Sequence, residues 1–274
     1  MDWFIELGAI AQAFIATSLT WVATAVGAAI VLGTSRSSHR WLDASLGVAA
    51  GVMIAASFWS LLNPSISMAV EAGYGRWRWL PALIGFLAGG ASLQAADRLL
   101  PHVHLDLIEL EGLRTSWRRS TLLLAAITLH HIPEGLAVGV AFGAAASIDP
   151  GSAAGATAIA SAVALAIGIG LQNVPEGTAV ALALRREGMG RRRALFWAQM
   201  SGAVDPLAGV AGAGLVMLVT PALPYALAFA AGAMMFVVAE ELIPESRRHG
   251  HVHLATMGVL VGFALMMVLD VAFG

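Results

Sequence analysis

Long apolar stretches, separated by short polar segments, follow one another along the whole chain. Stretches of about 20 residues are long enough for an α-helix to cross a hydrocarbon layer of roughly 30 Å. The alternating apolar and polar positions of outer-membrane barrel strands are not seen in the sequence. We therefore expect eight membrane-spanning helices, at residues 8–32, 44–64, 79–96, 121–146, 154–184, 194–219, 222–244 and 252–273.

The composition agrees with this pattern. Hydrophobic residues make up 58% of the chain, charged residues only 12%, and the mean hydropathy is +0.80. Soluble domains carry roughly 25% charged residues. We expect an all-α integral membrane protein whose residues 1–274 form a single transmembrane domain. The absence of cysteine excludes disulfides and thiolate ligands, and the first residues lack the positive charge of a cleaved signal peptide.

The arginines predict the orientation of the helices. All 15 basic residues are arginine, and 13 of them fall in the loops on one side of the expected membrane. Only Arg76 and Arg78 fall on the other side. Because basic loops stay in the cytoplasm, both termini are expected outside it.

Two loops on the arginine-rich side contain short histidine-rich tracts. The tract PHVHLDLIELEG includes His102 and His104, and the tract RRHGHVH includes residues 249–253. Such tracts can bind metal weakly, or they can be ordinary solvated loops, and the sequence does not decide between the two.

Two related motifs, HHIPEG at 130–135 and QNVPEG at 172–177, interrupt the fourth and fifth apolar stretches. In each motif the first and fifth residues lie on one helix face; these are His130, Glu134, Gln172 and Glu176. A further polar residue, His131 or Asn173, follows the first position of each motif. The prolines at 133 and 175 remove helix hydrogen bonds, so we expect a kink and freed carbonyl groups that face a polar cavity.

The two motifs also indicate an internal repeat. One expected helix leaves the cytoplasm and the next returns, so the motifs run antiparallel. Copies that meet near mid-membrane imply a pseudo-two-fold axis in the membrane plane, which is the inverted-repeat arrangement of secondary transporters.

Three acids lie near the expected mid-membrane plane: Glu134, Glu176 and Asp205. Each carboxylate at such a depth costs roughly 2.5–3.5 kcal/mol, and no arginine lies in the centre of any expected helix. Protons or a bound cation must therefore supply the positive charge. A purely structural role for protonated carboxyls is less favoured, because three acids with two histidines exceed what hydrogen bonding between helices requires.

Imidazole with carboxylate ligands favours Zn²⁺ and related first-row divalent ions, whereas an all-oxygen site would favour Mg²⁺ or Ca²⁺. Two divalent ions would bring a charge of +4 against the −3 of the three carboxylates, so a two-metal site bridged by Glu134 and Glu176 is electrostatically reasonable. Because such ligands must lose protons, metal affinity should fall at low pH.

HHIPEG, QNVPEG and the pair Asp205-Pro206 resemble the ZIP (ZRT/IRT-like) family of divalent metal transporters, within it the bacterial zinc transporters. The resemblance covers nearly the whole chain. It implies a binuclear centre with a first metal held by His130, Glu134, Gln172 and Glu176, helped by Met53. It implies a second metal held by His131, Glu134, Asn173, Glu176 and Asp205.

The chain departs from the family pattern in places. Relatives often have Asn and Asp where this chain has His131 and Asn173, and Glu where it has Asp205. The second metal position is therefore expected to differ in affinity or in metal preference. By the same resemblance Glu240 and Glu241, with Glu245, would line a metal exit path; Asp43 and Ser60 are weaker candidates for the path.

The resemblance further implies a 3+2+3 inverted-repeat arrangement of helices, an elevator-like or rocking movement, and a homodimer in a bacterial inner membrane. The expected activity is the transport of Zn²⁺ into the cytoplasm, with Cd²⁺, Fe²⁺ and Mn²⁺ as further candidate substrates. Metal ions and membrane lipid are the expected partners, nucleic acid is not, and no enzymatic activity is expected.

Two other functions were weighed. A metal-selective channel with the same ligands cannot be separated from a carrier by sequence. An intramembrane metalloenzyme is disfavoured, because its HExxH signature places a general base between two histidines and this chain has HHxxE.

Overall fold

The computed structural model describes residues 2–33, 39–99, 119–149, 152–218 and 220–273. Within these residues the chain is helical, with no strand, as the apolar pattern predicts. The short elements are α1 (Asp2–Ile5), η2 (Gly75–Trp77) and η3 (Thr220–Ala222). The long helices and their extensions are α2 (Ala9–Gly33), α3–η1–α4 (His39–Ala56, Ser57–Leu62, Asn63–Glu71), α5 (Trp79–Leu99), α6 (Arg119–Ala145), α7 (Ala153–Arg186), α8 (Arg191–Ser201), α9 (Val204–Leu218), α10–η4–α11 (Leu223–Val237, Val238–Leu242, Ile243–Arg247) and α12 (Val252–Phe273).

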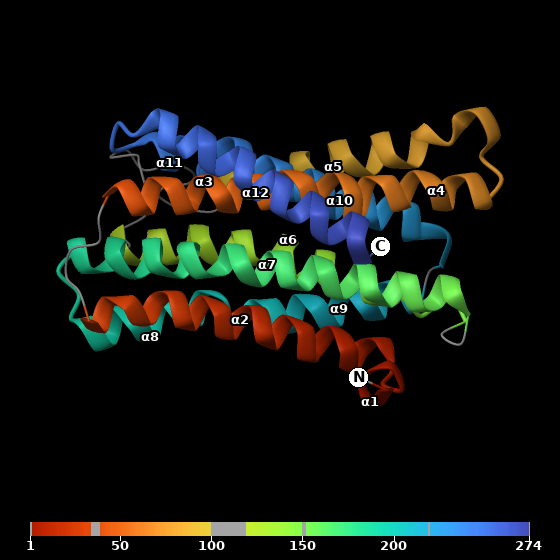
Figure 1. The fold of residues 1–274 in the computed structure, drawn as a ribbon, viewed down its shortest axis with the longest axis horizontal. Coiled ribbons are helices and arrows are strands. Elements are labelled where there is room, and N and C mark those ends of the chain that lie inside the picture. Colours follow the sequence, from red (N-terminus) through yellow and green to blue (C-terminus); the bar gives the residue numbers. More distant parts are fainter. Residues whose placement is uncertain (1, 34–38, 100–118, 150–151, 219, 274) are drawn as a thin grey trace.

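Six helical segments of the described chain are long and apolar enough to cross a membrane. They are Ala9–Gly33, His39–Glu71, Gly75–Ala96, Ala153–Arg185, Leu223–Arg247 and Val252–Ala272. The fourth and sixth expected spans are not among them. Helix α6 has 27 residues, about 40 Å, and lies alongside α7 in Figure 1. Eight crossings therefore remain a prediction.

The sixth expected span, 194–219, is not one continuous helix in the structure. The chain forms two helices here, α8 and α9, separated at Gly202 and Ala203. Pro206 has no amide hydrogen to donate to the carbonyl of Gly202, four residues earlier. That carbonyl instead accepts a hydrogen bond from the Asp205 amide at 3.0 Å, so the chain turns and Asp205 lies in the first turn of α9.

Prolines act differently in the other helices. Helices α6 and α7 run without interruption through Pro133 and Pro175. The two π-helical turns, η1 and η4, instead end two residues before Pro64 and Pro244. A π-turn accommodates the missing proline amide by inserting one residue into the helix, and such turns are frequent at functional sites. Glu241 lies in η4.

The helices pack in two groups of four expected spans (Figure 1). In one group α2 packs on α7 and α6 packs on α9; in the other α3 packs on α12 and α5 packs on α10. Glycines bring these partners together. A Cβ at Gly27 would lie 1.9 Å from the Val174 carbonyl oxygen, and one at Gly51 would lie 2.0 Å from that of Val259. Only glycine permits such close backbone approach.

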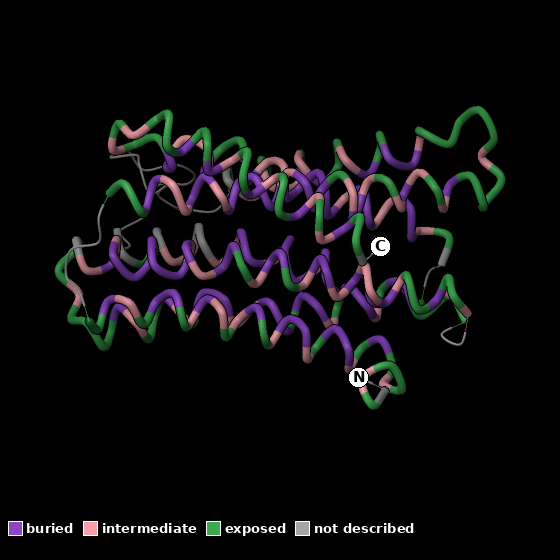
Figure 2. Tube along the Cα trace, viewed as in Figure 1, coloured by how far each residue is buried: buried purple, intermediate pink, exposed green. Residues whose placement is uncertain are grey.

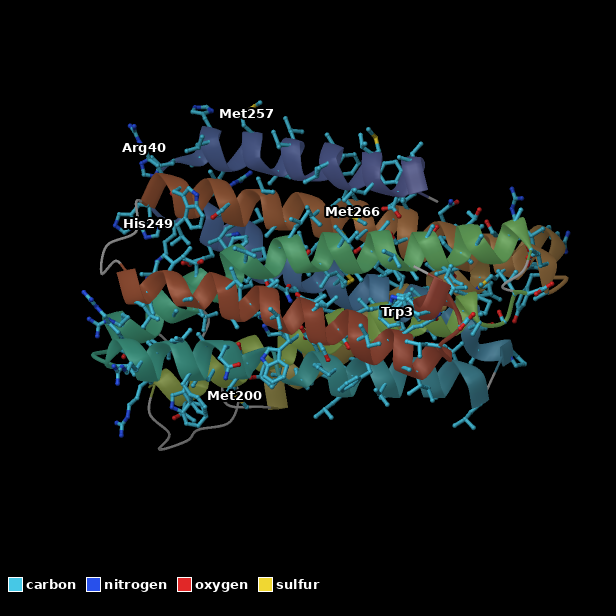
Figure 3. All side chains as sticks on the ribbon, turned by 60° about the horizontal axis from the view of Figure 1, so that its bottom comes forward. Trp3, Arg40, Met200, His249, Met257 and Met266 are labelled. Carbon is cyan, nitrogen blue, oxygen red and sulfur yellow. The ribbon has the colours of Figure 1, made fainter. Side chains whose placement is uncertain are left out.

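The buried residues lie along the helix sides that face one another, while exposed residues cover the outer faces of the bundle (Figure 2). Both chain termini lie toward one end of the bundle (Figure 1). Arg40 and His249 lie at the opposite end, away from Trp3 (Figure 3). This end also contains the α7–α8 junction, which is rich in arginine.

Candidate metal centre

A buried trio of titratable side chains lies where α6 meets α9. His131 Nδ1 is 3.2 Å from Asp205 Oδ1 and 3.5 Å from Glu134 Oε2. None of the three side chains is more than 2% exposed. One ligand atom from each lies within 4.8 Å of the others, so the three together could hold a metal ion. Among the described residues this is the group with that property.

Helix α7 brings the amides of its motif to the same place. Gln172 Nε2 donates to Glu134 Oε1 at 3.1 Å, and Asn173 Nδ2 lies 3.4 Å from Asp205 Oδ2. Both amides are buried. Gln172 Oε1 has no hydrogen-bond donor among the described residues, although it is fully enclosed. A buried oxygen without a donor is costly unless a cation contacts it, so this atom fits a metal ligand.

The glycine of each motif explains how the ligands come together. A Cβ at Gly135 would lie 2.5 Å from the carbonyl oxygen of Asp205 in α9. A Cβ at Gly177 would lie 2.2 Å from the carbonyl oxygen of Thr24 in α2. The residue after each glutamate is therefore a point of close helix approach, and only glycine allows it.

A second polar group lies beside the trio. His130 Nδ1 is 2.6 Å from Glu241 Oε2, which η4 contributes from the other helix group. His130, Glu176 and Glu241 line one small cavity of about 30 Å³ together with apolar side chains. A cavity needs roughly 10–15 Å³ to hold one water, so this one can accept a small ion or a water. The arrangement puts two carboxylates and an imidazole around one empty volume.

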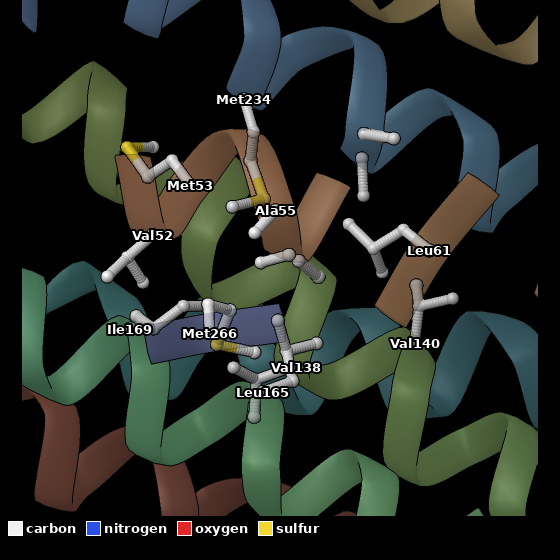
Figure 4. Close-up of a cluster of buried hydrophobic side chains, with 14 of the residues drawn as sticks. Val52, Met53, Ala55, Leu61, Val138, Val140, Leu165, Ile169, Met234 and Met266 are labelled. Carbon is white, nitrogen blue, oxygen red and sulfur yellow. The ribbon is translucent and has the colours of Figure 1, made fainter. Parts of the chain in front are cut away.

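Within the described residues, two of the expected residues, Glu240 and Met53, make no polar contact with these groups. Glu240 is exposed, because a side chain next to the buried Glu241 points to a different side of the helix. Met53 is fully buried in the main apolar cluster (Figure 4). Figure 4 places it among apolar neighbours that include Val52 and Met234.

The sequence analysis missed a buried pairing at the arginine-rich end. Asp43 is fully buried, and its two oxygens lie 2.7 Å from His249 Nδ1 and 2.9 Å from His251 Nδ1. The His39 and His249 rings stack at 4.0 Å. The second histidine-rich tract is therefore joined to α3. The other tract, with residues 102–104, lies outside the described residues.

Asp270 and Thr20 were also missed. Ser60 Oγ donates to Asp270 Oδ1 at 2.6 Å, both buried, in the α3–α12 group. Thr20 Oγ1 lies 3.2 Å from Asp205 Oδ2. The signal for Thr20 was the spacing of Thr17, Thr20 and Thr24, which places three hydroxyls on one face of an apolar helix.

Known proteins similar to this chain match nearly all of it. The family described as "ZIP Zinc transporter" matches residues 104–270. "Zinc transporter ZIP11" of Bos taurus is 41% identical, with 97% of this chain and 98% of the relative covered. "Zinc transporter GufA" of Myxococcus xanthus is 39% identical over 95% of this chain and 98% of its own. "Zinc transporter ZIPB" of Bordetella bronchiseptica is 39% identical, covering 93% and 79%.

Proposed function

Because the chain belongs to the ZIP zinc transporter family, we propose that it carries Zn²⁺ into the cytoplasm through the buried centre between α6, α7 and α9. The observation that carries this proposal is the buried trio of His131, Glu134 and Asp205. Imidazole and carboxylate are ligands that zinc prefers. A carboxylate inside a membrane also requires a compensating positive charge.

The proposed centre holds two ions. The first is bound by His130, Glu134, Gln172 and Glu176, with Met53 as an additional ligand; the second is bound by His131, Glu134, Asn173, Glu176 and Asp205. Contacts of Glu134 support its bridging role, because Oε1 faces Gln172 and Oε2 faces His131. The cavity shared by His130 and Glu176 supports the first position.

The proposed direction follows a series of metal-binding side chains toward the arginine-rich end, which the positive-inside rule assigns to the cytoplasm. Glu241 contacts His130 of the first position, and Glu240 and Glu245 share its helical segment. Asp43, His249 and His251 meet at the same end. We propose that zinc passes from His130 to Glu241 and leaves along these residues.

We propose an alternating-access movement of the two helix groups against each other. Within each group the partners are joined by glycines that touch the backbone of the next helix. Between the groups, the space at Gly168 of α7 is filled by the flexible side chain of Met266 in α12. Rigid groups with an adaptable contact favour movement as units over bending. An elevator-like displacement of α2, α6, α7, α8 and α9 would then carry the ions across the membrane.

The remaining parts of the proposal concern the whole protein. We propose a single domain with eight crossings in 3+2+3 order, both termini outside the cytoplasm, in a bacterial inner membrane and as a homodimer. Cd²⁺, Fe²⁺ and Mn²⁺ are proposed as further substrates, because the same ligands bind first-row divalent ions.

Uptake by proteoliposomes tests the proposal. His130→Ala and Glu176→Ala should abolish zinc uptake while the purified variants keep the wild-type amount and melting temperature. Arg191→Ala is the matched control, because this exposed arginine donates to the Leu32 carbonyl at the end of α2 and, among the described residues, contacts no proposed ligand. Undiminished uptake by both ligand variants would remove the two residues from the transport path.

A further inference from the structure

Helix α2 carries a row of buried threonines that faces α8 and α9. Thr17, Thr20 and Thr24 are at most 2% exposed, although α2 is otherwise a strongly apolar helix. A Cβ at Gly209 would meet Thr17, and one at Gly202 would meet Thr24. The row therefore lies beside the break in the sixth expected span, on the side of the second metal position.

Thr20 touches two of the three ligands that are specific to that position, Asp205 and Asn173. Its hydroxyl lies 3.2 Å from Asp205 Oδ2 and 2.8 Å from the carbonyl oxygen of Thr17. Its own carbonyl oxygen lies 3.4 Å from Asn173 Nδ2, which also faces Asp205. Bonds to an ionised carboxylate are roughly twice as strong as neutral ones, so the hydroxyl stabilises Asp205 in this orientation.

The neighbours of the Asn173 amide satisfy only one of its two orientations. With Nδ2 toward Asp205, Oδ1 faces only acceptors, Glu134 Oε2 at 3.0 Å and the Ile169 carbonyl oxygen at 2.8 Å, so this orientation needs a cation at Oδ1. With the amide turned over, Nδ2 donates to Glu134, and Oδ1 accepts from Thr24 Oγ1 at 3.3 Å. The first orientation presents an oxygen to a metal, and the second directs that oxygen away.

We infer that α2 tunes the second metal position alone: Thr20 holds Asp205 in its ligating orientation, and Thr24 favours the non-ligating orientation of Asn173. This inference rests on the two-ion centre proposed above. The first position has different neighbours, since His130 contacts Glu241 and shares its cavity with Glu176. Thr20 and Thr24 are therefore positioning residues that act through Asp205 and Asn173.

Thr17 offers a matched control on the same helix. Its hydroxyl donates to the carbonyls of Ala13 at 2.6 Å and Phe14 at 3.3 Å, both in α2 itself. It is as buried as Thr20 but contacts no ligand. Thr17→Val and Thr20→Val thus remove the same group at the same depth, and only the second removes a contact to Asp205.

Equilibrium dialysis of the purified full-length protein against Zn²⁺, and separately Cd²⁺, measures both ions. Thr20→Val should weaken the binding of one ion by about 10- to 100-fold, which is the range for losing a partner of a metal ligand. The affinity for the other ion should be unchanged. Thr24→Val should bind the second ion as tightly as wild type or a few-fold more tightly. Thr17→Val should bind as wild type, and Thr20→Ser, which keeps the hydroxyl, should restore binding.

The outcome that overturns the inference is wild-type binding of both ions by Thr20→Val, or an equal loss in Thr17→Val. A second measurement uses Asp205→Asn as background: there Thr20→Val should cause no further loss, and an additive loss would show that Thr20 does not act through Asp205. Wild-type protein that binds no ion would contradict the proposed function. Wild-type protein that binds two, with Thr20→Val unchanged, would contradict this inference alone.

Discussion

At the scale of single residues, Glu134 is the side chain on which the centre depends. It is 1% exposed, and its oxygens face different partners, Gln172 on one side and His131 on the other. Water cannot solvate a carboxylate in this position, so its charge must be balanced by the groups or ions that it contacts. A bridging carboxylate between two divalent ions meets that requirement.

Glu134→Gln keeps the shape of this side chain and removes its charge. We expect both ions to bind at least tenfold more weakly, because each loses one anionic ligand, and zinc uptake to fall below detection. Equilibrium dialysis and proteoliposome uptake measure the two effects. Glu187→Gln, at an exposed position after α7, is the control. Wild-type binding by Glu134→Gln would show that this carboxylate does not bridge the ions.

At the scale of helices, the glycines after the two glutamates set the distance between ligand-bearing elements. Gly135 touches the backbone of α9 at Asp205, and Gly177 touches α2 at Thr24. Any side chain here would push α9 or α2 away from the ligands of α6 and α7. Each motif thus combines a proposed ligand with the contact that brings a neighbouring helix to it.

Gly135→Ala should therefore lower both stability and zinc binding. Overpacking of this kind costs about 1–3 kcal/mol, and the shift of Asp205 should weaken the second ion. Gly214→Ala is the control, because a Cβ there meets nothing within 4 Å and alanine favours a helix. Melting temperature and dialysis measure the difference; two variants that behave alike would contradict a role for close packing at Gly135.

The sequence predicts these elements unevenly. Hydropathy places the helical segments, because a membrane requires long apolar runs whatever the fold. It does not show that the sixth segment divides, since Gly202 and Pro206 barely lower its hydropathy, and the break follows from one missing amide. The second expected segment, 44–64, is also shorter than the observed helical segment at both ends. Helix α3 begins at His39, and α4 continues to Glu71.

The residues of the candidate site are also predicted unevenly. The acids at 134, 176 and 205 were found because charge is costly in a membrane. Thr20 was missed because a threonine can satisfy its hydroxyl within its own helix, so it gives no such signal. The contact of Asp43 with His251 joins residues 208 positions apart and exists only in the folded chain.

At the scale of the whole molecule, the proposed metal centre and the proposed exit lie on different helix groups. His130, Glu134 and Asp205 belong to the group of α2, α6, α7 and α9. Glu241 belongs to the other group, which contains α3, α5, α10 and α12. The His130–Glu241 contact at 2.6 Å therefore crosses the boundary between them. Relative movement of the groups would make and break this contact during transport.

Joining the two groups should stop transport without preventing metal binding. The chain has no cysteine, so Gly168→Cys with Met266→Cys introduces a single reactive pair between α7 and α12. After reaction with a short bifunctional thiol reagent, we expect zinc uptake to be lost and dialysis to give unchanged binding. Tyr74→Cys with Tyr225→Cys lies within one group and is the control. Full uptake by the linked 168–266 variant would contradict movement at this boundary.

The most direct measurement is the anomalous scattering of a crystal grown with Zn²⁺ or Cd²⁺. The account predicts two peaks between α6, α7 and α9, with one of them among His131, Glu134 and Asp205. Peaks confined to the Asp43 and His251 end, or no peak beside Glu134, would contradict a metal centre in the middle of the bundle.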